Sequence, residues 1–226
     1  MCGIFGSTNF EKFKTLYSIN QDRGAFSFGG CYVSSIGDVE LMIEKAPGVV
    51  DLDDGVQTNH NYFTGHTQAP TSAQREFSHE TTHPFTTGNW AVAHNGVLSN
   101  NRQIIAKYDF HNVNEVDSSV IPALIDHNEI IDRSNVVQQE IFAIREALEE
   151  LDGTYACWII NKVTGNVYIA RVGSTLFMNR DTGDFSSKKH RDLKTVPEGL
   201  IFKLNSDNMC FEIAGQFKYN SPYFIL

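Results

Sequence analysis

The chain begins with Met1-Cys2-Gly3-Ile4-Phe5-Gly6, and the rest of the sequence is best interpreted around this segment. Cys2 carries a thiol, the potential nucleophile, and removal of Met1, which the small Cys2 side chain permits, would add a free α-amine. That amine has an ordinary pKa of about 7.7 to 8.0, so it can accept the thiol proton near neutral pH. The glycines leave room around the sulfur, and the two apolar residues predict a short buried strand. The alternative is an inert Cys2 behind a retained Met1.

Composition describes an ordinary globular chain. It has 226 residues, of which 41% are hydrophobic and 20% are charged, and this length predicts one large domain, 1–226, with a substantial core. A formal charge of -9 argues against sequence-independent binding of nucleic acid, which requires clustered Lys and Arg. The sequence contains neither an apolar run of membrane-spanning length nor a basic start followed by a long apolar stretch, so we expect a cytoplasmic protein.

The cysteines are spaced too widely for a metal knuckle. Cys31, Cys157 and Cys210 lie in apolar, strand-like surroundings, and we expect them to be reduced core residues.

Hydrophobic periodicity predicts strands, then helices, then strands, which favours sheets with helical layers over a repeating βα unit. We expect a helix over 10–19 capped by Asn9, a loop over 21–30, and a long polar connection over 68–88. The other expected helices are 102–108, 118–127 and 137–151. The other expected strands are 31–34 paired with 39–43, then 62–67, 90–94, 155–161, 167–171, 176–179, 200–204 and 209–213.

Several short motifs occur in one characteristic order and together resemble the glutaminase domain of class II glutamine amidotransferases, which are N-terminal-nucleophile hydrolases. The match spans most of the chain. The motifs are Met1-Cys2-Gly3-Ile4-Phe5-Gly6, Arg23-Gly24, Gly65-His66-Thr67-Gln68-Ala69-Pro70-Thr71, Thr82-His83-Pro84-Phe85, Ala93-His94-Asn95-Gly96-Val97, Asp117, Leu151-Asp152-Gly153-Thr154-Tyr155-Ala156, Ala170-Arg171-Val172-Gly173-Ser174 and Phe185-Ser186-Ser187.

The resemblance implies an α+β fold, a four-layer αββα sandwich with Cys2 at the edge of one sheet. It implies that the Asn95 side chain and the Gly96 backbone N–H form an oxyanion hole, where two fixed donors would stabilise the charge that thiolate attack puts on an amide oxygen. By itself, however, Asn95-Gly96 is also typical of a type I′ hairpin turn.

The resemblance also assigns the substrate pocket. Asp117 matches the residue that pairs with the α-ammonium of glutamine, although an Asp there would equally cap the following helix. Thr71 and His83 match pocket positions, and Arg23 matches a supporting residue near the nucleophile. The implied reaction requires neither a metal nor another cofactor.

The chain departs from the family at Gln68, where an arginine usually pairs with the α-carboxylate of glutamine. A neutral amide supplies no charge, and charge-assisted hydrogen bonds contribute about 1.5 to 3 kcal/mol against about 1 for neutral ones. We therefore expect weaker glutamine binding unless Arg75 substitutes. Ala69 and Phe26 depart from the family as well.

The segment His79-Glu80-Thr81-Thr82-His83 fits the H-E-x-x-H pattern of zinc proteases. That pattern requires a helix, whereas Thr81 and Thr82 are poor helix formers and Pro84 follows at once. We expect a surface loop over the Cys2 pocket instead.

The main hypothesis is a standalone glutaminase domain that takes L-glutamine and passes ammonia to a partner synthase subunit. Residues 222–226 are apolar and fit two interpretations, a docking site for that partner or a final core strand, of which we favour the strand. The alternatives are an N-terminal-nucleophile amidohydrolase acting on another amide, a noncatalytic module that retains the fold, and a zinc hydrolase.

Overall fold

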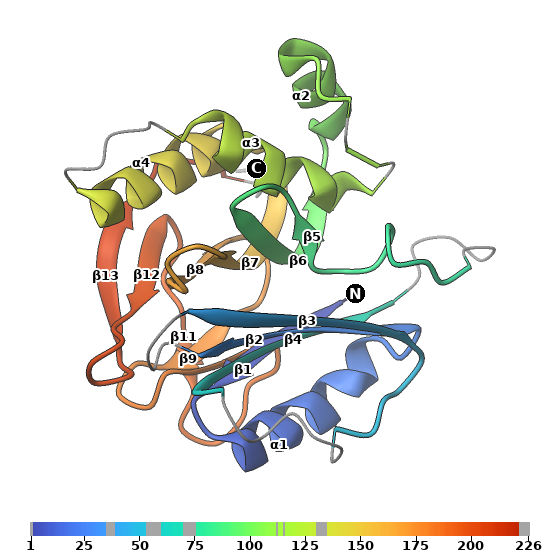
Figure 1. Cartoon of the computed structure of the whole chain (residues 1–226), viewed down its shortest axis with the longest axis vertical. Coiled ribbons are helices and arrows are strands. Elements are labelled where there is room, and N and C mark those ends of the chain that lie inside the picture. The colour runs from blue at the N-terminus through green and yellow to red at the C-terminus, as the bar shows by residue number, and fades with distance from the viewer. Residues whose placement is uncertain are drawn as a thin grey trace.

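The computed structural model describes residues 2–34, 39–52, 60–69, 76–111, 113–114, 116–129 and 135–221. Within these residues two antiparallel sheets stack face to face, and helices cover both outer faces (Figure 1). This is the four-layer αββα sandwich that the resemblance implies. No helix in the described ranges is long and apolar enough to cross a membrane.

The first sheet contains the strand that follows Cys2. In spatial order its described strands are β11 (Lys194–Thr195), β9 (Phe177–Asn179), β10 (Asp184–Ser186), β1 (Gly3–Ser7), β4 (Tyr62–Gln68), β2 (Ser27–Ser34) and β3 (Glu40–Pro47). Strand β1 therefore lies between β10 and β4, and Ile4 pairs with His66. The nucleophile candidate is thus attached to an inner strand, held on both sides.

The second sheet contains the Asn95-Gly96 pair. Its described strands are β13 (Phe211–Gln216), β12 (Leu200–Leu204), β8 (Val167–Val172), β7 (Gly153–Asn161), β6 (Trp90–Leu98) and β5 (Phe85–Thr86), in that order. Strand β6 runs unbroken through the pair, because Asn95 aligns with Ala156 and Gly96 with Tyr155. The expected end of this strand at Asn95-Gly96, and with it the hairpin-turn alternative, is wrong.

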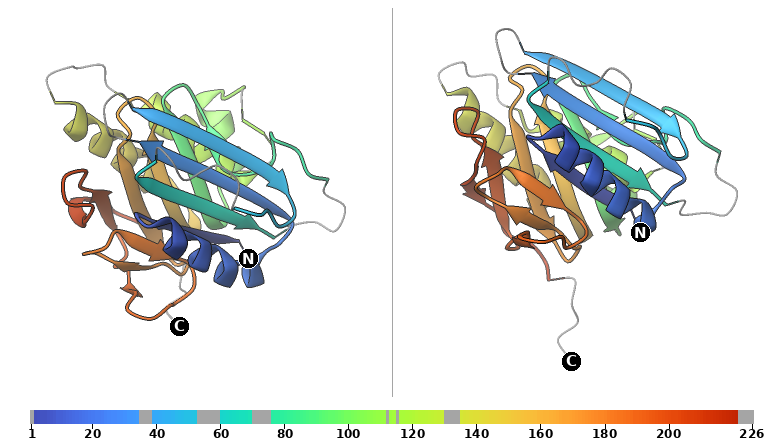
Figure 2. Two further views of the ribbon diagram at one scale, coloured as in Figure 1. Left: turned by 60° about the horizontal axis from the view of Figure 1, so that its bottom comes forward. Right: turned by 90° about the horizontal axis from the view of Figure 1, so that it is seen from below.

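Helices form the two outer layers. Helix α1 (Phe10–Asn20) lies along the outer face of the first sheet (Figure 2). It begins as expected, because the Asn9 side chain accepts a hydrogen bond from Lys12 N at 2.9 Å. Helices α3 (Val120–His127) and α4 (Val136–Glu149) cover the second sheet. The other helical elements are α2 (Asn101–Tyr108) and the 3₁₀ turns η1 (Gln21–Arg23) and η2 (Asp117–Ser119).

Three groups of buried apolar side chains fill the spaces between the four layers. Aromatic residues such as Phe13 and Phe63 join α1 to the first sheet. Ile4, Trp158 and their neighbours fill the space between the sheets, and Ile144 and Leu148 attach α4 to the second sheet. Burial of this apolar area is the main favourable term in folding.

Several expected boundaries were wrong. Residues 27–30, assigned to a loop, belong to β2, and the strand expected over 209–213 begins at Phe211. Cys210 therefore precedes the strand and is only half-buried, whereas Cys31 and Cys157 are buried as expected. The short strands β5, β10 and β11 were not predicted. Residues 222–226 lie outside the described ranges, so the docking and core-strand hypotheses for the tail remain predictions.

Candidate active site

Cys2 directly precedes β1, at the end of an inner strand of the first sheet. Arg23 holds the Cys2 backbone in place. Arg23 Nε donates to Cys2 O at 2.8 Å, and its Nη1 donates to Ser187 O at 3.2 Å and to Thr175 Oγ1 at 3.1 Å. The Cys2 thiol lies 4.0 Å from Ala69 O, just beyond the end of β4. Arg23 therefore contacts the candidate nucleophile through the backbone, which fits the supporting position that the resemblance gives it.

Burial is the main influence on the acidity of the Cys2 thiol. It raises the pKa above the ordinary value because the thiolate loses water, and the nearby Asp117 carboxylate raises it further. The positive charge of Arg23 acts in the opposite direction. The thiol therefore requires a base close to the sulfur before it can react near neutral pH.

Asn95 lies on the face of β6 that meets the first sheet. Its side chain is 2% exposed, and its Nδ2 lies 3.4 Å from Ser187 Oγ. The same Ser187 oxygen accepts a hydrogen bond from Ile4 N at 3.0 Å, and Ser187 N donates to Ile4 O at 2.8 Å. One serine thus connects the Asn95 amide to the strand that carries Cys2. Ser187 belongs to one of the sequence motifs, but that motif does not predict this connection, because it depends on the pairing of Ser187 with Ile4 and Asn95, which are far away in the sequence.

Gly96 needs to be a glycine for two reasons. Its φ is +153°, a conformation that residues with a side chain rarely adopt, and an added Cβ would lie 1.9 Å from Thr154 O. The unusual backbone sits directly beside Asn95, at the position where the resemblance places the second oxyanion donor.

Asp117 is the first residue of η2, and backbone amides hold both of its carboxylate oxygens. Leu98 N donates to Oδ2 at 2.8 Å, and Ser118 N donates to Oδ1 at 2.8 Å. The residue at the N-cap position is Val116, so Asp117 is not the N-cap of the helix. Its influence on the Cys2 pKa shows that the carboxylate lies within electrostatic reach of the thiol.

Gln68, the last residue of β4, uses both ends of its side chain within the protein. Its Oε1 accepts from Ser27 Oγ at 3.1 Å, and its Nε2 donates to Thr81 O at 3.3 Å. Gln68 is 2% exposed and ties the segment 79–84 to the first sheet. Thr71 and Arg75, the other residues predicted near this pocket, lie outside the described ranges.

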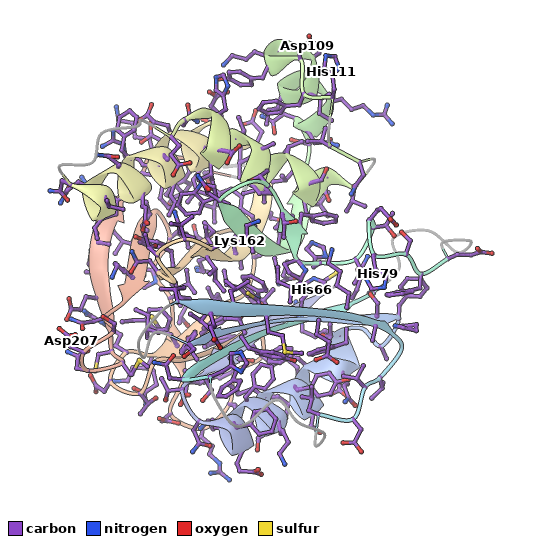
Figure 3. All side chains as sticks on the ribbon, in the orientation of Figure 1. His66, His79, Asp109, His111, Lys162 and Asp207 are labelled. Carbon is purple, nitrogen blue, oxygen red and sulfur yellow. The ribbon has the colours of Figure 1, made fainter. Side chains whose placement is uncertain are left out.

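Two buried histidines stack beside Gln68. The rings of His66 and His83 have centroids 3.9 Å apart and planes 27° apart. His66 Nε2 lies 3.2 Å from His94 O on the opposite sheet, and burial lowers the pKa of His66 to about 3, so the ring is neutral (Figure 3). His66 belongs to one of the motifs, but no sequence pattern predicts its position between the two sheets.

The H-E-x-x-H segment forms turns and bends rather than a helix. His79 is exposed at the outer end of the segment (Figure 3). His83 is buried and stacks on His66. The two histidines therefore do not share one face, as zinc binding by this motif requires. Among the described residues, no group of three or more His, Cys, Asp or Glu side chains is arranged to hold a metal ion.

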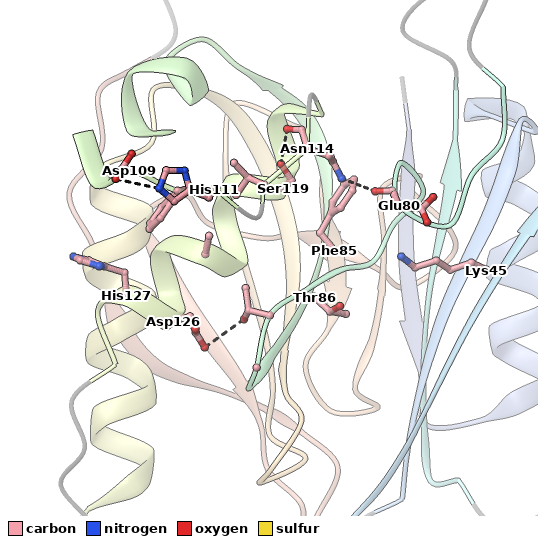
Figure 4. A pocket seen from close by; sticks show the side chains of 15 residues that line it. Lys45, Glu80, Phe85, Thr86, Asp109, His111, Asn114, Ser119, Asp126 and His127 are labelled. Atoms are coloured by element: carbon pink, nitrogen blue, oxygen red, sulfur yellow. Dashed lines mark hydrogen bonds and ion pairs between the residues drawn. The ribbon is translucent and has the colours of Figure 1, made fainter. Parts of the chain in front are cut away.

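A separate cavity of about 940 Å³ lies between the β5 region and the segments around α2 and α3 (Figure 4). Charged and aromatic side chains line it, and Cys2, Asn95 and Asp117 are absent from its lining. Lining side chains include Lys45, Phe85, Asp109, His111, Asp126 and His127. This large cavity is therefore distinct from the candidate active site.

Known proteins resemble the chain in sequence and in fold. No family model matches it. It is 26% identical over 200 residues to 7-cyano-7-deazaguanine synthase 2 of Sulfurisphaera tokodaii, covering 80% of this chain and 41% of the relative. It is 28% identical over 197 residues to the glutamine–fructose-6-phosphate aminotransferase of the same organism, covering 81% of this chain and 32% of the relative. The chain thus spans about a third to two fifths of the curated relatives it matches.

A solved structure confirms the fold. The glutamine phosphoribosylpyrophosphate amidotransferase from B. subtilis superposes with a TM-score of 0.71 at 21% identity, covering 95% of this chain and 49% of that one. The chain therefore shares the fold of the matching half of that amidotransferase, in agreement with the fold that its motifs predict.

Proposed function

We propose that the chain hydrolyses the side-chain amide of glutamine and supplies the ammonia for amidotransfer, with Cys2 as the nucleophile. The observation that carries this proposal is the continuous path from β1 through Ser187 to Asn95, which fixes the amide beside the strand of the nucleophile. The matched region is 41% and 32% of the two sequence relatives and 49% of the structural neighbour, so in each of them it is joined to further sequence.

The proposed reaction has two steps. The Cys2 thiolate attacks the carboxamide carbon, and the Asn95 Nδ2–H and Gly96 N–H donors stabilise the resulting oxyanion. The C–N bond then breaks, the nitrogen leaves as ammonia with the proton taken from the thiol, and a γ-glutamyl thioester remains. Water attacks the thioester, the C–S bond breaks, and glutamate and the thiol are released.

The base in this scheme is the α-amine of Cys2 after removal of Met1. An amine on the same residue reaches the sulfur directly or through one water, and it has an ordinary pKa near neutral pH. Once it is protonated, its positive charge would stabilise the thiolate against the rise in the thiol pKa that burial causes. Asp117 would bind the α-ammonium of glutamine, and His83 and Thr71 would complete the pocket.

The ammonia would pass to a synthase that uses it. Two kinds of matching relative carry the words synthase and aminotransferase in their names, and each is much longer than the matched region. We propose that this chain serves such an acceptor-using partner, either as a separate subunit or as part of the same protein.

A second candidate function is hydrolysis of an amide that lacks a free α-carboxylate. The observation that favours it is Gln68, which is neutral and has its side chain bonded to Ser27 and Thr81. Nucleophile and oxyanion donors would act in the same way on such a substrate.

The test is the intact mass of the native protein before and after treatment with the glutamine analogue 6-diazo-5-oxo-L-norleucine, followed by peptide mapping and an ammonia-release assay. We expect loss of Met1, one adduct on Cys2 and no adduct on a Cys2→Ala variant. A Cys31→Ala variant is the control, because that thiol is buried in the core. Glutamine hydrolysis that persists in Cys2→Ala would refute the proposal. A processed but unlabelled Cys2 would favour the second candidate.

A further inference from the structure

A polar connection links β6 to Asp117 on the helix-facing side of the second sheet. Consecutive strand residues point to opposite faces, so His94 points toward η2 while Asn95 points toward the first sheet. His94 is 2% exposed, and its Nδ1 lies 2.8 Å from Ser118 Oγ. Ser118 directly follows Asp117 and is also buried.

The partners of His94 decide which atom carries the hydrogen. His94 Nε2 lies 3.3 Å from Thr154 O, and a carbonyl oxygen can only accept. The hydrogen of the neutral ring is therefore on Nε2, and Nδ1 accepts a hydrogen bond from the Ser118 hydroxyl. Burial lowers the pKa of His94, which keeps the ring neutral, although the Asp117 carboxylate opposes this.

This bond holds the residue whose N–H contacts Asp117. Ser118 N donates to Asp117 Oδ1 and Leu98 N donates to Oδ2, each at 2.8 Å. Each carboxylate oxygen thus has one backbone donor in a fixed direction, and Ser118 Oγ also lies 3.2 Å from Asp117 Oδ1. The single hydroxyl hydrogen can go to only one acceptor, and the bond to His94 Nδ1 directs it away from the carboxylate. Because Leu98 belongs to β6 and Ser118 is bonded to β6 through His94, the strand that carries Asn95 also fixes Asp117.

We propose that His94 and Ser118 are positioning residues that orient Asp117 toward the α-ammonium group of the substrate. This inference rests on the proposed function. It predicts that breaking the His94–Ser118 bond weakens recognition of the substrate amine without impairing the oxyanion donors.

The experiment compares glutamine with 4-carbamoylbutanoate, which is glutamine without its α-amine. The measured quantity is the ratio of kcat/KM for the two amides, which isolates the contribution of the amine. The variants are Ser118→Ala, His94→Phe and the double variant. The matched control is Ser119→Ala, because Ser119 Oγ donates to Val116 O at 2.7 Å and has no bond to Asp117.

We expect each single variant to lower this ratio about tenfold, since a hydrogen bond to a charged group is weakened and part of the contact survives. The double variant should lower it no further than Ser118→Ala alone, because His94 acts on Asp117 through the Ser118 hydroxyl. Turnover of 4-carbamoylbutanoate should stay within about twofold of the wild type, and Ser119→Ala should leave the ratio unchanged.

Two results would overturn the inference while leaving the glutaminase proposal intact. One is an equal loss of activity on both amides in Ser118→Ala, which indicates a merely structural role, and the other is an unchanged ratio. Both proposals would be overturned if the wild-type protein did not hydrolyse glutamine and calorimetry showed no glutamine binding to the Cys2→Ala variant.

Discussion

The two sides of the candidate site are built in different ways. On one side, five consecutive residues of β6, His94–Leu98, provide the Asn95 amide, the Gly96 backbone and the Leu98 amide that holds Asp117. On the other side, Gln68 and His83 come from the end of β4 and from an irregular segment that packs against it. The first side lies within an inner strand, whereas the second depends on a long connection.

This difference separates the proposed oxyanion donors, which lie on the β6 side together with Asp117, from Gln68, where the resemblance places recognition of the substrate α-carboxylate. Stabilisation of an oxyanion requires donors that do not move, and β6 supplies them because it is paired with β7 along its whole length. Substrate recognition tolerates change in a connecting segment, because loops accept substitution without disturbing the core. The chain keeps the family pattern at Asn95-Gly96 and departs from it at Gln68, in agreement with this division.

The largest expected effect tests the β6 side. Asn95→Ala should lower kcat for glutamine hydrolysis about 100- to 1,000-fold with little change in KM, because one oxyanion donor is lost. Ammonia release measured over a range of glutamine concentrations gives both constants. Asn205→Ala is the control, since this asparagine lies in an exposed turn and bonds to Glu212. A change in KM alone would place Asn95 on the specificity side and erase the proposed division.

The sequence predicts much of the β6 side and less of the other. Asn95-Gly96 alone suggested a hairpin turn, and only the order of the motifs favoured the interpretation in which both residues serve the site. Helices such as α4 followed from apolar periodicity. Strand β2 was placed too late, because residues 27–30 include two glycines and have weak strand propensity. Pairing with β3 and β4 makes them a strand, and Gly29 lets His83 O approach to a point 1.8 Å from where a Cβ would lie.

Contacts between segments far apart in the chain explain the rest of what was missed. Ser187 contacts Ile4, 183 residues away, and the His66–His83 stack depends on the fold of the intervening connection. No local pattern encodes such pairings. Short strands such as β10 likewise form because a neighbouring strand is present.

A second prediction concerns the bond between the two sides. His66 reaches from β4 to His94 O on β6, and its pKa of about 3 lies below the ordinary value of about 6.5. The unfolded chain therefore binds more protons between these values. The free energy of unfolding should be fully retained above pH 6.5 and fall as the pH decreases, by up to about 1.4 kcal/mol per pH unit from this residue.

Urea unfolding at several pH values measures this dependence. His66→Phe should show a shallower fall in unfolding free energy between about pH 6 and pH 4 than the wild type. His111→Gln, a change at an exposed ring that lies beside Asp109, is the control. Identical slopes in the wild type and His66→Phe would show that the contact between the sides does not depend on a neutral His66.

The smallest expected effect tests the Gln68 side with 4-aminobutanamide, which is glutamine without its α-carboxylate. If an arginine paired with that carboxylate, its loss would cost about 1.5 to 3 kcal/mol, which lowers kcat/KM roughly 12- to 160-fold. Gln68 supplies no charge, and both ends of its side chain are bonded within the protein. The ratio of kcat/KM for glutamine to that for 4-aminobutanamide should therefore be below about tenfold.

Ser27→Ala, which removes one partner of Gln68, should change this ratio less than threefold, because it frees only a neutral acceptor. A preference above about 100-fold for glutamine would instead require a cation near the carboxylate, and Arg75→Ala would then be the variant to measure. In that case the two sides would differ in how they are built but not in how strictly they recognise the substrate.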